Sequence, residues 1–183
     1  MKKWIIGSLV GAIIVFAWQA ASWMFLGIHN DAVKHTPAEE NILSALTSNL
    51  TEEGSYMIPC PKPDATQKEK DEWMKQQEGK PWATVIYHPS HNSDMTNAMI
   101  WGFVVDLILV ILLISILVRG GLPTFTGIFT GCIAVGIFSF LWHPYMGHVW
   151  FQLPWSMIKG DLYDAVAAWG LCGLWLGWWL RRP

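Results

Sequence analysis

The chain has 183 residues, of which 52% are hydrophobic and only 14% are charged, with a formal net charge of −2. A soluble domain carries about 25% charged residues, so this composition favours a membrane protein. The small net charge and the lack of a basic stripe exclude a nucleic-acid-binding protein. Only Cys60 of the three cysteines lies in polar sequence, which excludes a disulfide framework and argues against thiol oxidoreductase chemistry.

Four apolar stretches are long enough to cross a bilayer, which takes about 20 residues. They cover residues 4–28, 99–118, 122–142 and 162–180. The first could instead be a cleaved signal peptide, because two lysines precede it and Ala20-Ala21-Ser22 is a possible cleavage site. Its apolar run continues beyond Ser22, which favours a retained anchor. The sequence therefore predicts an all-α transmembrane fold with four spans.

Basic residues near the ends of the spans predict the orientation. These residues are Lys2, Lys3, Arg119, Arg181 and Arg182, and four spans would place all of them on one side of the membrane. Short cytoplasmic segments carry an excess of lysine and arginine. Both termini are therefore expected in the cytoplasm, with residues 29–98 outside it.

Small residues predict how the spans pack. Pairs of glycines four residues apart occur in the first, third and fourth spans, and such pairs allow helices to approach closely in lipid. The pattern favours a four-helix membrane bundle, with a homodimer face as the alternative. The short link Arg119-Gly120-Gly121 predicts that spans two and three are antiparallel neighbours, which makes residues 99–142 a transmembrane hairpin.

Residues 29–98 are too many for a structureless loop. Thr36-Pro37-Ala38-Glu39 has the pattern of a capping box before a helix, and residues 65–77 are typical of a solvated helix. Residues 55–59 and 82–88 are expected to be short strands, each ended by a proline. The sequence thus predicts a small α+β extracytoplasmic cap between spans one and two.

The predicted organisation has five parts. Residues 143–161 are rich in tryptophan, tyrosine and proline and are expected to lie at the membrane interface as an aromatic segment. The parts are transmembrane helix 1 (1–28), the cap (29–98), the transmembrane hairpin (99–142), the interfacial segment (143–161), and transmembrane helix 4 with its cytoplasmic tail (162–183).

Ionisable residues gather toward the predicted outer face. A carboxylate or imidazole within a span is costly and is therefore a candidate functional group. The candidate cluster is His29, Asp106, His143, Asp161 and Asp164, and the secondary candidates are His88 and His91. The cluster is compatible with a metal site, with a path for protons or small solutes, or with a packing role in which Asp106 bonds Trp18, Ser22 or a histidine. No HExxH, paired CxxC, GxSxG or phosphate-loop motif supports an enzyme.

Several motifs resemble those of one protein family. The first span and its exit carry Phe16-x-Trp18-x3-Ser22-Trp23-Met24-x-Leu26-x2-His29, followed by Gly54-x-Tyr56-x2-Pro59 and later by Trp142-His143-Pro144. This order resembles an uncharacterised family of small four-span bacterial inner-membrane proteins. The resemblance implies the four-span architecture and a location in the bacterial inner membrane, and it implies no activity.

Two functions are expected from these observations. The first is a non-catalytic envelope protein of the inner membrane whose cap and polar cluster interact with an envelope protein or with a second copy of the chain. The alternative is a metal-binding or proton-handling membrane protein, or an enzyme, that acts through the outer-leaflet His/Asp cluster. No cofactor is expected apart from the metal ion of that alternative.

Overall fold

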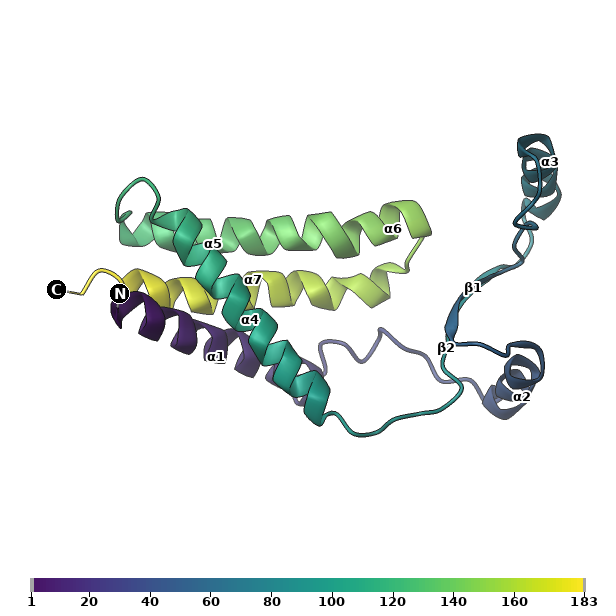
Figure 1. Ribbon diagram of the computed structural model, residues 1–183, viewed down its shortest axis with the longest axis horizontal. Helices are drawn as coiled ribbons and strands as arrows, with labels where there is room; N and C mark the ends of the chain where they lie inside the picture. Colours follow the sequence, from purple (N-terminus) through teal and green to yellow (C-terminus); the bar gives the residue numbers. More distant parts are fainter. Residues whose placement is uncertain (1, 183) are drawn as a thin grey trace. The chain divides into compact units, whose positions relative to one another are not determined.

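The computed structural model describes residues 2–182, which form two compact units. One unit contains the residues up to 34 and from 94 onward, and the other contains residues 35–93. The first unit is entirely helical in its regular elements (Figure 1). Its elements are α1 (Lys2–Met24), α4 (Thr96–Leu117), α5 (Phe125–Phe140), the π-helical η1 (Leu141–Tyr145), α6 (Met146–Phe151) and α7 (Trp155–Trp179).

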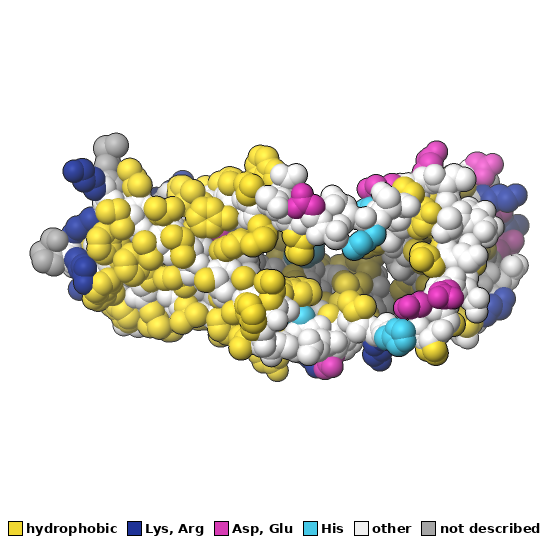
Figure 2. Space-filling model, turned by 90° about the horizontal axis from the view of Figure 1, so that it is seen from below, with side chains coloured by type: hydrophobic (Ala, Val, Ile, Leu, Met, Phe, Trp, Pro, Cys, Tyr) yellow, Lys and Arg dark blue, Asp and Glu magenta, His cyan; other side chains and the backbone are white. Residues whose placement is uncertain are grey.

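Three helices are long and apolar enough to cross a membrane: Lys2–Met24, Thr96–Leu117 and Phe125–Phe151. They correspond to the first three predicted spans. Helix α7 has 25 residues, but Lys159, Asp161 and Asp164 lie in its first half, and it is not among the three. Hydrophobic side chains cover much of the helical unit, as expected for surfaces in contact with lipid (Figure 2).

Helix α7 packs against both α1 and α5, while α4 packs mainly against α1. The sequence predicts that spans two and three are antiparallel neighbours, whereas each of these helices packs mainly on another helix. Helices α4 and α5 are joined by residues 118–124 and have little contact, of which Leu117 against Gly131 is one example. Helix α5 instead packs closely on α7. A Cβ atom on Gly136 would lie 2.1 Å from the carbonyl oxygen of Ala165, so α5 approaches α7 far more closely than a larger residue would allow.

The paired glycines of α1 and α7 face other helices of the same chain. Ideal Cβ atoms on Gly7 and Gly11 would contact Trp179 and Cys172 of α7, respectively. On α7, Gly173 faces Phe129 and Gly177 faces Phe125. The glycine surfaces of α1 and α7 are thus occupied within the chain, which favours intramolecular packing over a homodimer face.

The third apolar helix continues past Trp142, where the sequence predicts its end. Pro144 has no backbone N–H to donate, and its ring would clash with the carbonyl group four residues earlier in a regular α-helix. The helix therefore widens into the π-helical turn η1 and then continues as α6. Gln152 has a positive φ of 54° and reverses the chain, and α7 then begins at Trp155. Residues 143–161 are therefore two helix ends joined by a short turn.

Basic residues gather at one end of the helical unit. Both termini and the link between α4 and α5 lie at this end (Figure 1), and Figure 2 shows the lysine and arginine side chains there. Tryptophans join α1 to α7 at this end, because the Trp175 indole donates to the Gly7 carbonyl at 3.1 Å and the Trp179 indole donates to the Lys3 carbonyl at 2.8 Å.

The second unit contains α2 (Glu39–Asn49), β1 (Gly54–Ile58), α3 (Gln67–Gln77) and β2 (Ala83–Tyr87). The two strands pair antiparallel, with Gly54 opposite Tyr87 and Ile58 opposite Ala83. Each strand lies within one residue of the predicted position.

The predicted capping box at Thr36 is wrong. Its hydroxyl accepts from the Ala38 N–H at 3.3 Å, and α2 begins at Glu39 without a side-chain cap. A complete capping box instead starts α3, where Thr66 and Glu69 bond each other's backbone N–H groups.

Candidate functional site

Asp164 of α7 is bonded by three side chains from α1 and from the turn that follows it. Its Oδ1 accepts from the Trp18 indole at 2.9 Å and from the Ser22 hydroxyl at 2.6 Å. Its Oδ2 lies 2.9 Å from Nε2 of His29. Ser22 and His29 are buried. A carboxylate between helices is costly unless its oxygens are bonded, and these three contacts satisfy both oxygens of Asp164.

A sharp turn after α1 brings His29 to this carboxylate. Gly27 has a positive φ of 64°, which glycine adopts without steric cost, and the chain folds back beneath Trp23. The rings of Trp23 and His29 stack 3.8 Å apart and are nearly parallel, at 7°. On the α7 side, a Cβ on Gly160 would lie 2.5 Å from Nδ1 of His29, so only glycine leaves room for the imidazole there.

Asp106 of α4 is the most deeply buried carboxylate of the predicted cluster, with only 3% of its surface exposed. Its Oδ1 accepts a hydrogen bond from the Gln19 amide at 3.3 Å. Its Oδ2 is buried and has no hydrogen-bond partner in the described chain. Buried polar atoms are usually satisfied, so an unbonded carboxylate oxygen requires a reason.

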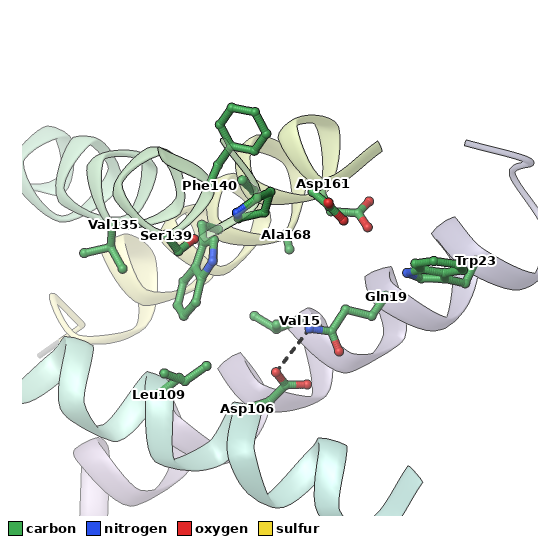
Figure 3. A pocket seen from close by; sticks show the side chains of 14 residues that line it. Val15, Gln19, Trp23, Asp106, Leu109, Val135, Ser139, Phe140, Asp161 and Ala168 are labelled. Atoms are coloured by element: carbon green, nitrogen blue, oxygen red, sulfur yellow. Dashed lines mark hydrogen bonds between the residues drawn. The ribbon is translucent and has the colours of Figure 1, made fainter. Parts of the chain in front are cut away.

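Asp106 lines a cavity of about 470 Å³ between α1, α4, α5 and α7. Figure 3 shows Asp106 with Gln19 on one side of this cavity and Asp161 on another. The lining side chains with carboxylate, amide or hydroxyl groups are Gln19, Asp106, Ser139, Asp161 and Asp164. No Lys, Arg or His is among the described residues that line it. We refer to this space as the carboxylate cavity.

We refer to Asp164 and its three bonded side chains as the Asp164 network. An ion pair is formed by residues that lie near members of this network in the sequence. Lys159 of α7 donates a hydrogen bond to Asp31, which follows His29 by two residues. This hydrogen bond, together with the charge of Lys159, lowers the pKa of the exposed Asp31 carboxyl below its ordinary value. The pair joins the turn after α1 to the start of α7, as the His29–Asp164 contact does.

The structure brings part of the predicted cluster together. His29 and Asp164 are in direct contact, and Asp106, Asp161 and Asp164 line one cavity. His143 is exposed and lies beside Asp161 in a neighbouring cavity. The predicted partners of Asp106, namely Trp18, Ser22 and a histidine, bond Asp164 instead, because α7 packs directly on that face of α1.

The secondary candidates lie in the second unit. His88 contacts the Glu53 carboxylate at 3.3 Å, and both side chains are exposed. His91 is also exposed and lies beside a groove that Leu43, Leu46 and Ile86 help to line. Neither histidine has the buried setting of His29.

Within residues 2–182, no group of three or more His, Cys, Asp or Glu side chains is arranged to hold a metal ion. His29 and Asp164 offer two such groups, and three of their four nitrogen and oxygen atoms already have partners. The fourth, Nδ1 of His29, faces Gly160.

Sequence reasoning missed three contributors to the site. Gln19, the partner of Asp106, is the only side-chain amide in the first apolar stretch, and a polar residue there is a usable signal. The Trp23–His29 stack depends on the turn at Gly27 and has no comparable signal. The Asp31–Lys159 pair joins residues far apart in the chain and requires the fold to be seen.

No protein-family model, curated protein sequence or solved structure matches the chain.

Replacing Asp164 with alanine is expected to destabilise the helical unit by about 2 kcal/mol. The change leaves the Trp18, Ser22 and His29 side chains without their acceptor, and each interhelical hydrogen bond in a membrane protein contributes about 0.6 to 1.7 kcal/mol. Reversible unfolding of the purified protein in mixed detergent micelles measures this loss.

Asp161→Ala is the matched control, since it removes a carboxylate one turn earlier on the same helix without removing those three bonds. Equal destabilisation by the two substitutions would show that the Asp164 network does not hold α1 to α7.

Proposed function

We propose that the chain is a four-span protein of the bacterial inner membrane with both termini in the cytoplasm. The gathering of Lys2, Lys3, Arg119, Arg181 and Arg182 at one end of the helical unit supports this orientation, because cytoplasmic segments are rich in such residues. Residues 29–98 then lie outside the cytoplasm as the cap, and the Asp164 network lies in the outer half of the membrane.

Helix α7 serves as the fourth span in this proposal. Its 25 residues extend about 38 Å at 1.5 Å per residue, more than the roughly 30 Å of the hydrocarbon core. Each of its charged side chains has a compensating environment. Lys159 pairs with Asp31, Asp164 accepts bonds from α1, and Asp161 faces the carboxylate cavity. Ionisable groups within membrane helices are tolerated in such settings.

The function proposed for the protein is the non-catalytic binding of a small positively charged ligand in the carboxylate cavity. The observation that carries this proposal is Oδ2 of Asp106, a buried carboxylate oxygen that lacks a partner and belongs to a residue lining a cavity. A cation in the cavity would lie near this carboxylate and offset its charge, because burial makes an unpaired carboxylate costly and an ion pair favourable by comparison.

The charges around the cavity support a cation over an anion. Asp106 and Asp161 approach it from different helices (Figure 3), and Asp164 also lines it. His29 is bonded to Asp164 and does not line the cavity. An anionic ligand would meet carboxylates without a lysine or arginine among the lining residues to offset their repulsion.

Interaction with an envelope protein or with a second copy of the chain remains part of the proposal for the cap. Helix α2 has no buried residue, and its Ile42 and Leu43 side chains are exposed. An apolar helix face of this kind is typical of a surface that meets another molecule. This role is compatible with ligand binding in the membrane and is independent of it.

Cysteine labelling in intact bacterial cells tests the topology. Cys60 is exposed and lies in the proposed cap, whereas Cys132 and Cys172 are buried among the helices. A maleimide that reaches the periplasm but does not cross the inner membrane is expected to label the wild type, and Cys60→Ser should abolish the labelling.

Two further variants, each made in the Cys60→Ser background, test the cytoplasmic side. Gly120→Cys lies in open space in the α4–α5 link, and Arg181→Cys lies at the exposed end of α7. Both should react only after the inner membrane is disrupted. Labelling of the Arg181→Cys variant in intact cells would show that α7 does not span the membrane.

Binding of methylammonium, a compact cation, tests the proposed function. Wild-type protein in lipid nanodiscs should bind it saturably, and Asp106→Asn should weaken that binding by about tenfold or more, as expected for loss of one charge pair worth about 1.4 kcal/mol. The asparagine keeps the shape of the side chain and an oxygen for the Gln19 hydrogen bond. Isothermal titration calorimetry measures the affinities.

Asp64→Asn is the matched control, because it removes the same charge from an exposed position in the other unit. The proposal fails if the wild type, the Asp106→Asn variant and the Asp64→Asn variant all bind cations alike, or if none of them binds.

A further inference from the structure

We propose that the ligand of the carboxylate cavity is an amphiphilic ammonium ion, whose apolar part occupies a second, aromatic cavity beside it. This inference rests on the proposed function and adds the chemical class of the ligand. A carboxylate site alone accepts any small cation. A carboxylate site joined to an apolar site selects a cation that carries a hydrocarbon or aryl group.

The second cavity has a volume of about 530 Å³ and lies where η1 and α6 meet the start of α7. We refer to it as the aromatic cavity. Its apolar lining includes Trp142, Trp150, Phe151, Leu153 and Met157. Such walls favour a hydrocarbon or aryl group, because ligand pockets gain most of their affinity from apolar contact and use a few polar groups for orientation.

The two cavities share part of their walls. Trp23, Pro144 and Asp161 line both of them. Asp161 therefore lies at their junction, with a carboxylate available to a charged group there. A molecule with one positive group and one apolar group can place the first toward Asp106 and Asp161 and the second among the tryptophans.

The helix irregularity at Pro144 helps to form this junction. The π-helical turn Leu141–Tyr145 displaces the end of the third apolar helix, and Pro144 itself lines both cavities. Single π-helical turns within α-helices occur frequently at functional sites.

The described side chains suit an ammonium group better than a bare metal ion. No three metal-ligating side chains in residues 2–182 converge, and Asp106 and Asp161 are each a single carboxylate. An ammonium group needs only hydrogen-bond acceptors and negative charge, and indole faces such as that of Trp23 attract it further. Trp23 keeps its orientation through its stack on His29, which in turn is bonded to Asp164.

A series of n-alkylammonium ions from methyl to hexyl tests the inference. The protein is placed in nanodiscs of phosphatidylglycerol, a lipid without an ammonium group. Each added methylene should tighten binding to the wild type by about fourfold until the aromatic cavity is filled. The corresponding neutral alcohols should not show Asp106-dependent binding, and the Asp106→Asn variant measures adsorption to the lipid itself.

Trp142→Ala distinguishes the aromatic cavity from the carboxylate cavity. Trp142 is exposed and lines only the aromatic one, so its loss should weaken hexylammonium binding by about fivefold and leave methylammonium binding unchanged. Trp101→Ala is the matched control, because Trp101 is similarly exposed on α4 and lines neither cavity.

The ammonium group could come from a soluble amine or from an aminophospholipid, and one further arm separates these sources. Addition of phosphatidylethanolamine to the nanodiscs should weaken hexylammonium binding if the lipid is the occupant. Unchanged binding would identify a soluble amine.

The inference is overturned if Asp106-dependent binding is indifferent to chain length and to Trp142→Ala, an outcome that leaves the proposed function standing. If no ammonium ion of any length binds in an Asp106-dependent manner, both proposals fail.

Discussion

The helical unit depends on the bonding of one carboxylate. Asp164 accepts hydrogen bonds from Trp18 and Ser22 of α1 and contacts His29, which follows α1. An unbonded carboxylate would be costly among apolar helices, but these contacts satisfy it and link α7 to α1. Hydrogen bonds have defined lengths and directions, and apolar contacts do not. The network therefore sets which face of α1 meets α7 and where the chain turns after α1.

Different interactions join α1 and α7 at their opposite end. There the indoles of Trp175 and Trp179 donate to backbone carbonyls of α1, and glycines allow the two helices to approach. With α1 and α7 joined at both ends, α4 packs on α1 and α5 packs on α7. The carboxylate cavity lies between these four helices, at the level where Asp106 and Asp161 face it.

The apolar stretches, the two short strands and most candidate polar residues could be predicted from the sequence, because length, alternation and the cost of buried charge are local properties. The partners of those residues could not. Trp18 and Ser22 are four residues apart in the first apolar stretch and share a helix face, but whether that face meets Asp106 or Asp164 depends on which helix packs there. That choice depends on the packing of α7 on α1, which no periodicity reveals. Likewise, the sequence predicts that the third span ends at residue 142, whereas the helix continues through a π-helical turn that contains Pro144.

The central claim is that Asp164 and its partners on α1 act together across the helix interface. A double-mutant cycle with Ser22→Ala and Asp164→Ala tests it most directly, with unfolding free energies measured for all four proteins under one condition. The account predicts a coupling energy of about 1 kcal/mol between the two positions. Effects that add to within about 0.3 kcal/mol would contradict it.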